Sequence, residues 1–364
     1  MKSKKFFFEK FSNKFIFIGI ISILFFKIIF YFLTNFNFLN ISLGGGSDAN
    51  YYHSYAIGNV DIATTIWPEI LRYFYSIELY SRDFFSFILF FISILVIPYL
   101  TVKITGLNGF EEQKYTFTLF FIITLYPTLL YYSTDIYRDI FMIFIYLFIL
   151  FLIKNLFFSP IIVNKLAILL LIIPLIYLLY KLREYLGMSI LLSFLFLGIN
   201  FNKNRLLIFS ILYLLILFLL NYAGFFSSIT EYREGFEETG GGSTIGLSFS
   251  NPILFIPNLI LSFLAQMFGL YVTNIFSLII FIVESVPFIM CFFYVIKNIK
   301  YQDAFVRYLL LFFIIYASVW VIGNDNVGTA VRLRMFNYFA IYICAFYIMH
   351  KKNIIRNNKE DLCK

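Results

Sequence analysis

Long uncharged apolar stretches recur along this chain and are separated by short polar segments. Ten of these stretches approach the roughly 20 residues that an α-helix needs to cross the hydrocarbon core of a bilayer. They lie at about 15–33, 84–102, 115–132, 140–153, 166–180, 186–199, 206–222, 275–296, 304–322 and 336–349. The pattern therefore predicts an all-α, polytopic integral membrane protein with about ten transmembrane helices.

A further apolar segment, 252–271, is ambiguous because prolines, an asparagine, a glutamine and a glycine interrupt it. Basic residues near the ends of transmembrane helices stay on the cytoplasmic side. If this segment crossed the membrane, the basic tail after Met349 would lie outside. We therefore expect an interfacial or re-entrant helix here, both termini in the cytoplasm, and outer loops at about 35–83 and 223–251. The whole chain, 1–364, is expected to form a single transmembrane domain.

The composition agrees with a membrane protein and excludes a soluble globular one. Apolar residues make up 61% of the 364 positions and charged residues 13%, and the mean hydropathy is +0.87. A soluble domain carries about 25% charged residues. The spans leave little length for a separate soluble domain, so any chemistry takes place in or at the membrane.

The basic residues differ in kind between the two predicted sides of the membrane. Of the 19 on the cytoplasmic side, 16 are lysine, whereas seven of the eight on the outer side are arginine. The outer eight are Arg72, Arg82, Arg138, Lys181, Arg183, Arg233, Arg332 and Arg334. A planar guanidinium binds phosphate or carboxylate at two points and is weakly hydrated. The outer face is therefore expected to bind an anion, unless these arginines pair with the acids next to them in the sequence.

Acidic candidates for catalysis lie in the first outer loop. Asp48 follows the glycine run 44–46 and precedes Tyr52 and His53, and glycines let the backbone approach a ligand closely. We expect Asp48 to act as a general base or to bind a sugar, with Tyr52 and His53 as binding residues. The alternative for Asp48 is a helix cap. Glu69, in an amphipathic stretch further along, is the second candidate.

Two basic candidates follow predicted spans in the first half of the chain. Arg138 comes after a Tyr-Pro turn, and its expected partner is Asp135 or Asp139. Arg183 lies between two spans with almost no loop, so it is expected at the level of the lipid headgroups. Snorkelling of a long basic side chain is the alternative explanation for its position.

Three more basic candidates lie in the second half. Arg233 belongs to a polar segment beside a glycine run, which suits either a lid over a site or a plain flexible loop. Arg332 and Arg334 precede the last span and have no adjacent acid, which makes them the best anion-binding candidates. The three cysteines and two histidines show no metal-ligand spacing, so no metal site is expected.

Several short motifs, in order along most of the chain, resemble those of bacterial O-antigen (Wzy-type) polysaccharide polymerases. They are Gly45-Gly46-Ser47-Asp48 with Tyr52, Tyr126-Pro127 with Arg138-Asp139, Arg183-Glu184-Tyr185-Leu186, and Gly328-Thr329-Ala330-Val331-Arg332-Leu333-Arg334. The resemblance implies a GT-C-like membrane glycosyltransferase without metal or other cofactor. Such an enzyme joins undecaprenyl-pyrophosphate-linked oligosaccharide repeats on the periplasmic face of the bacterial inner membrane.

The same resemblance implies which groups take part. The arginines would stabilise the pyrophosphate leaving group in place of a metal ion. Expected partners are the lipid-linked oligosaccharide, membrane lipids and a polysaccharide chain-length regulator, with no nucleic acid among them. The substantial first outer loop departs from the family's usual pattern, in which the main outer loops lie in the middle and late chain.

Three other functions remain open. The first outer loop with Asp48 also resembles GT-C transferases that use polyprenyl-phosphate sugars, where an acid in that loop acts as base. A lipid-linked oligosaccharide flippase or transporter usually shows internal repeats and polar residues near the bilayer midplane. This chain shows no clear repeat, and only Lys27 and Glu284 lie clearly within spans. A ligase that attaches finished polymer to lipid A core would differ from a polymerase in its acceptor.

Overall fold

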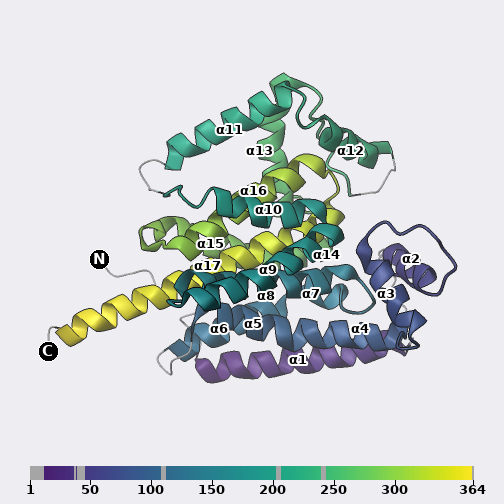
Figure 1. Cartoon of the computed structure of the whole chain (residues 1–364), viewed down its shortest axis with the longest axis horizontal. Coiled ribbons are helices and arrows are strands. Elements are labelled where there is room, and N and C mark those ends of the chain that lie inside the picture. Colours follow the sequence, from purple (N-terminus) through teal and green to yellow (C-terminus); the bar gives the residue numbers. More distant parts are fainter. Residues whose placement is uncertain are drawn as a thin grey trace. The chain divides into compact units, whose positions relative to one another are not determined.

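The computed structural model describes residues 12–36, 38, 46–107, 112–201, 206–238 and 243–362 (Figure 1). Within these ranges the regular structure is helical, and β-type pairing is limited to the isolated bridge between Thr244 and Asn326. The all-α prediction is therefore confirmed for this part of the chain. Contacts between Cα atoms group the chain into two compact units, 1–187 and 188–364.

Six helical segments among the described residues are long and apolar enough to cross a membrane. They are α1 (Asn13–Asn35), Arg82–Thr105, α8 (Arg138–Phe158), α9 (Ile162–Leu182), Ile275–Lys297 and α16 (Ala304–Gly323). A seventh arises if Ile208–Tyr222 and Ser227–Gly235, which are bent by 83°, form one broken span. These helices agree with a polytopic membrane protein, while the count of about ten and the GT-C-like arrangement stay predictions.

The predicted span at 115–132 is divided into α6 (Gln113–Leu125) and α7 (Pro127–Tyr131). Pro127 has no N–H and its ring clashes with the carbonyl four residues earlier, so the helix breaks before it. Lys27 of α1, which is buried, donates from Nζ to the Tyr126 carbonyl at this break, at 3.4 Å. A backbone carbonyl at the break thus accepts a hydrogen bond from a neighbouring helix.

Two other predicted spans differ in length from the apolar runs that suggested them. Only the short α10 (Glu184–Leu195) corresponds to 186–199, and it carries the chain from the first unit into the second. The run 336–349 lies inside α17 (Val327–Leu362), which extends well beyond it. Neither segment is by itself an apolar helix of the length that a crossing requires.

In the first unit, helices pack in the order α1, α6, α5, α8, α9 (Figure 1). α8 is more enclosed than α9, because 56% of the residues in its apolar stretch are buried, against 17% in α9. Helices that are apolar on all sides either fill a core or face lipid, so α8 is a core helix and α9 is expected to face lipid. The predicted outer loop 35–83 contains two helices that pack on each other, α2 (Gly46–Ala56) and α3 (Ile66–Ser76).

Both units contain a span with a π-helical turn just before a proline. In the first unit α4 (Arg82–Phe91) leads through Ile92–Val96 into α5 (Ile97–Thr105), which contains Pro98. In the second, α14 (Ile275–Ile280) leads through Phe281–Ser285 into α15 (Val286–Lys297), which contains Pro287. Each proline would meet the carbonyl four residues earlier, which lies inside the π-turn, and the wider turn relieves that clash. The helix therefore continues past each proline instead of ending.

In the second unit, the apolar part of α17 forms the core, and α13, α15 and α16 pack around it. Every side chain from Met335 to Met349 is buried. The predicted interfacial or re-entrant helix at 252–271 takes the form of the short 3₁₀-helix Pro252–Leu254 followed by α13 (Phe255–Gln266). Its position in a bilayer stays a prediction.

The predicted outer loop 223–251 is not a plain flexible loop over its first half. It contains α12 (Ser227–Glu238), which follows α11 (Leu206–Tyr222) and packs against α16. A Cβ on Gly323 would come within 2.7 Å of Ile229, so glycine permits this close approach. The glycine run at 240–242 lies outside the described residues.

Candidate functional site

The hairpin of α8 and α9 has Arg138, Lys181 and Arg183 at one end and Lys154 and Lys165 at the other. Arg138 Nη1, at the start of α8, donates to the Leu182 carbonyl at the end of α9, at 2.9 Å. Lys154 and Lys165 lie near the opposite end, where α8 leads into α9. We name these the arginine end and the lysine end of the hairpin.

Asp135 and Asp139, the expected partners of Arg138, pair with other arginines. Asp139 lies 3.3 Å from Arg183, and both side chains are buried. Asp135 accepts two hydrogen bonds from Arg82, at 2.9 Å from Nε and 2.6 Å from Nη2. The expectation for Arg138 was therefore wrong, because acids distant in sequence from Arg82 and Arg183 meet them where helices converge.

The first outer loop is attached to this arginine end through α2. Arg82 Nη2 also donates to Asn50 Oδ1 at 2.9 Å, so one guanidinium joins α2 to the segment before α8. The indole of Trp67, in α3, donates to the Ile136 carbonyl at 2.8 Å. Hydrogen bonds thus attach α2 and α3 of this loop to one end of the helix bundle of the first unit.

The acidic candidates each occupy the first turn of a helix in this loop. Asp48 is the third residue of α2 and is partly exposed, and Glu69 lies in the first turn of α3 and is exposed. Negative charge is favourable there because the N-terminal end of a helix is partly positive. Gly44 and Gly45, which precede Asp48, lie outside the described residues. The structure thus keeps both carboxylates at the surface, where a substrate could reach them.

Tyr52 and His53 differ in how far they are buried. Tyr52 is buried, whereas His53 is partly exposed and its Nδ1 lies 2.9 Å from the Tyr80 hydroxyl. Burial lowers the pKa of His53, with a further contribution from the positive charge of Arg82. Burial also raises the pKa of Tyr80 to about 12. Both shifts favour neutral groups, so a neutral imidazole and a neutral phenol share this hydrogen bond.

In the second unit, Arg233 joins α12 to the connection between α16 and α17. It forms a buried ion pair with Asp325. Its guanidinium also donates to four carbonyls, at 2.7 Å to Leu247, 2.9 Å to Val321, 3.4 Å to Ile322 and 2.5 Å to Asn324. Asp325 in turn accepts from the Gly246 N–H at 2.8 Å. This arginine therefore links α12 to Leu247 and to the α16–α17 connection, while a lid over a site stays a prediction.

Arg334 forms a second buried ion pair, with Glu284 in the π-helical turn of the α14–α15 span. The closest nitrogen and oxygen are 3.5 Å apart, and the two side chains are 2% and 0% exposed. Arg334 Nη1 also donates to the Gln266 carbonyl at 3.3 Å, and its guanidinium lies over the Tyr338 ring. A Cβ on Gly269 would come within 2.7 Å of Arg334 Nη1, so this glycine leaves room for the guanidinium.

Two amide side chains connect these ion pairs. Asn324 Nδ2 donates to Gln266 Oε1 at 2.5 Å, and Gln266 Nε2 donates to the Asn324 carbonyl at 2.8 Å. The Asn324 carbonyl also accepts from Arg233, and the Gln266 carbonyl accepts from Arg334. We name the set the buried polar network. It consists of Arg233, Ser262, Gln266, Glu284, Asn324, Asp325 and Arg334.

Arg332 and Arg334 do not present their side chains to the same side. Residues two apart on an α-helix point about 200° from each other. Arg334 points into the buried polar network, whereas Arg332 is partly exposed. A ligand at the surface of α17 therefore meets Arg332 first, and Arg334 lies behind it in the core of the unit.

The sequence contained a signal for only part of this arrangement. Glu284 stands out as an acid inside an apolar run, and charges in such positions are expensive and are retained for a role. Its partner Arg334 lies 50 positions later, and Asp325 lies 92 positions after Arg233. Pairing across such separations depends on which helices pack together, which a single sequence does not reveal.

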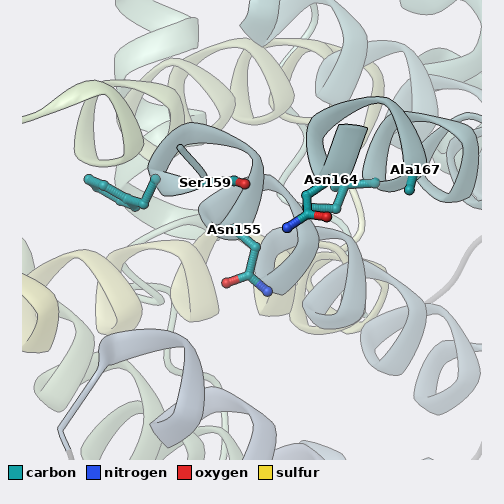
Figure 2. A pocket seen from close by; sticks show the side chains of 6 residues that line it. Asn155, Ser159, Asn164 and Ala167 are labelled. Atoms are coloured by element: carbon teal, nitrogen blue, oxygen red, sulfur yellow. The ribbon is translucent and has the colours of Figure 1, made fainter. Parts of the chain in front are cut away.

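The recess shown in Figure 2 is lined by none of the candidate residues. It is lined by Asn155, Ser159 and Asn164 together with Phe158, Ala167 and Ile168, at the lysine end of the α8–α9 hairpin. Among the described residues, no three His, Cys, Asp or Glu side chains are grouped closely enough to hold a metal ion. Comparisons with protein-family models, with curated proteins and with solved structures find no match to this chain.

Proposed function

We propose that this protein is a membrane-embedded glycosyltransferase that joins oligosaccharide repeats carried on a polyprenyl pyrophosphate. The motif resemblance to Wzy-type O-antigen polymerases leads to this proposal. The observation that carries it furthest is the gathering of arginines at one end of the membrane helices. In the first unit, Arg82 and Arg138 lie at the starts of α4 and α8, and Lys103 lies in the last turn of α5.

In the second unit the separation is partial, because Arg307 and Arg356 lie toward the same end as Lys351. Arg332 lies near the start of α17, and Lys351 lies further along it, paired with Asp303 at 3.1 Å. Lysine at one end suffices to orient the protein by the positive-inside rule. Arginine at the other end suits two-point binding of a phosphate. We propose that the helix ends that carry Arg82, Arg138 and Arg332 face the periplasm of a bacterial inner membrane and that catalysis takes place there.

Within this proposal the residues have different roles. Arg332, which is partly exposed, contacts the pyrophosphate as the glycosidic bond to it breaks. Arg334 and Arg233 contribute positive charge from behind Arg332, because their guanidinium groups are buried in ion pairs. Asp48, or alternatively Glu69, accepts the proton of the acceptor hydroxyl. Arg138 and Arg183 contribute positive charge at the arginine end of the first unit.

A test uses a gel that separates surface polysaccharide by the number of repeats. A strain that lacks this chain should retain single repeats and lose the ladder of longer chains. Wild-type protein and Arg356→Lys, at the opposite end of α17, should restore the ladder. Arg332→Lys should not, because a lysine ammonium cannot reproduce the two-point geometry. A complete ladder without the chain would refute the polymerase role.

Transport is the second candidate, because the Glu284–Arg334 pair lies inside an apolar span and α11 and α12 form a sharply bent pair. Charges within spans and broken helices are both common in transporters. A flippase would act before polymerisation. Its loss should therefore remove single repeats as well as longer chains and leave lipid-linked repeats on the cytoplasmic face. The same gel distinguishes the two functions.

A further inference from the structure

The connection between α8 and α9 forms a recess of about 410 Å³ at the lysine end of the hairpin (Figure 2). Asn155 comes from α8, Ser159 from the connection and Asn164 from the first turn of α9, and Figure 2 shows all three around the same space. Phe158, Ala167 and Ile168 line the remainder. The recess therefore has carboxamide and hydroxyl groups on part of its wall and apolar side chains on the rest.

The sequence around the recess carries positive charge without local acids. From 140 to 182 there is no Asp or Glu, whereas Lys154 directly precedes Asn155 and Lys165 directly follows Asn164. The lining is thus flanked by one lysine on each helix of the hairpin. Carboxamide and hydroxyl donors next to two ammonium groups favour an anionic ligand over a cationic or neutral one.

An apolar track leads away from the recess along α9. Ala167, Leu171 and Pro174 follow Asn164 at a spacing of three or four residues, so they continue its face of the helix, and each is exposed. α9 is also the least buried of the six long apolar helices. In a membrane such a face is in contact with hydrocarbon chains. The recess and the exposed face of α9 thus form one surface, which is polar and positively charged at one end and lipid-facing at the other.

We propose that this recess binds the headgroup of an anionic phospholipid. The phosphate accepts hydrogen bonds from Asn155, Ser159 and Asn164, and Lys154 and Lys165 neutralise its charge. One acyl chain lies along the exposed face of α9. Basic recesses between transmembrane helices are recognised sites for anionic headgroups. This proposal is independent of the chemistry at the arginine ends, because it concerns the opposite end of the hairpin.

The full-length chain, purified in a mild detergent, can be offered phosphatidylglycerol and phosphatidylcholine in equal amounts and examined by native mass spectrometry. Wild-type protein should retain phosphatidylglycerol preferentially. Lys165→Gln should weaken that retention about fivefold, since one lysine near an anionic headgroup contributes roughly a kilocalorie per mole. Asn164→Leu should weaken it further when combined with Lys165→Gln. Lys165→Arg keeps the charge and should retain the lipid.

Lys181→Gln is the matched control, because it makes the same change on the same helix at the arginine end. It should retain phosphatidylglycerol as the wild type does. The proposal is overturned if wild-type protein retains both lipids equally, or if Lys181→Gln weakens retention as much as Lys165→Gln. Displacement of the lipid by soluble glycerol 3-phosphate at equal concentration would also overturn it, because the ligand would then be a free phosphate compound.

Discussion

Gln266 and Asn324 form two reciprocal hydrogen bonds, from Asn324 Nδ2 to Gln266 Oε1 at 2.5 Å and from Gln266 Nε2 to the Asn324 carbonyl at 2.8 Å. They belong to α13 and to the connection between α16 and α17, and each also binds one of the two buried arginines. The pair therefore links the ion pair of Arg233 to that of Arg334. Because both amides are buried, the hydrogen bond between their side chains satisfies Gln266 Oε1 and one donor position of Asn324 Nδ2.

This relationship predicts strong coupling between the two positions. Asn324→Leu alone leaves the buried Gln266 Oε1 without its Asn324 donor, and Gln266→Leu alone removes one acceptor from Asn324 Nδ2, whereas the double variant removes both side chains. The double variant should therefore be less destabilised than the sum of the single variants, by about 0.5 to 3 kcal/mol. Unfolding of the solubilised protein by SDS measures the difference.

Asn298→Leu serves as the control for this cycle. Asn298 is also buried and donates to the Tyr294 carbonyl, but it lies near the other end of α16, a helix of 20 residues that spans about 30 Å. Its combination with Asn324→Leu should be additive. Equal coupling in both cycles would indicate a general loss of cooperativity instead of a direct link.

Arg233→Lys is predicted to destabilise the second unit although it keeps the charge. One ammonium cannot replace the donors that reach Asp325 and the Leu247, Val321 and Asn324 carbonyls together. We expect the free energy of unfolding to fall by about 1.5 to 3 kcal/mol, the contribution of a hydrogen bond to a charged group. Thermal unfolding followed by the fluorescence of Trp67 and Trp320 gives the measurement.

Arg72→Lys is the matched substitution at an exposed site. Arg72 lies 3.9 Å from Asp61, and their side chains are 42% and 90% exposed. Exposed ion pairs contribute about 0 to 1 kcal/mol, so this variant should unfold like the wild type. If Arg233→Lys behaved in the same way, Arg233 would not be the residue that fixes α12.

Asp48→Asn should nearly abolish polymer without loss of protein from the membrane. A general base contributes about 10² to 10⁴ in rate, whereas asparagine caps a helix about as well as aspartate. Polymer length on the polysaccharide gel and protein abundance in the membrane fraction are measured together. Normal polymer from Asp48→Asn combined with its loss in Glu69→Gln would assign the base to Glu69.

His53 is predicted to take up a proton only below the ordinary histidine pKa of about 6.5. Burial is the main reason and the charge of Arg82 the second. As the pH falls through about 6.5, the unfolded chain binds this proton before the folded one does, so His53 makes the folded state less stable at lower pH. Histidine-labelled NMR spectra recorded against pH measure the pKa, and His350→Gln assigns the two histidine signals. A pKa at or above 6.5 would contradict the prediction.

The apolar runs in the sequence were enough to predict a membrane protein and the positions of most of its long helices. Apolar runs without charges fold into helices in a bilayer because every backbone N–H and C=O must be bonded within the segment. This local requirement explains why α1, α8, α9 and α16 lie where the apolar runs predicted them. The candidate residues were also visible as polar groups beside such runs.

The choice of partner in each ion pair, in contrast, became visible only in the folded structure. Arg82 pairs with Asp135 and not with Asp83, and Arg183 pairs with Asp139 and not with Glu184. Neighbours in a helix point about 100° apart, whereas residues on packed helices can face each other directly. A buried charge costs several kcal/mol unless it is paired, so the packing of distant helices selects the partner. That choice depends on contacts between residues far apart in the chain, and local sequence patterns do not specify these contacts.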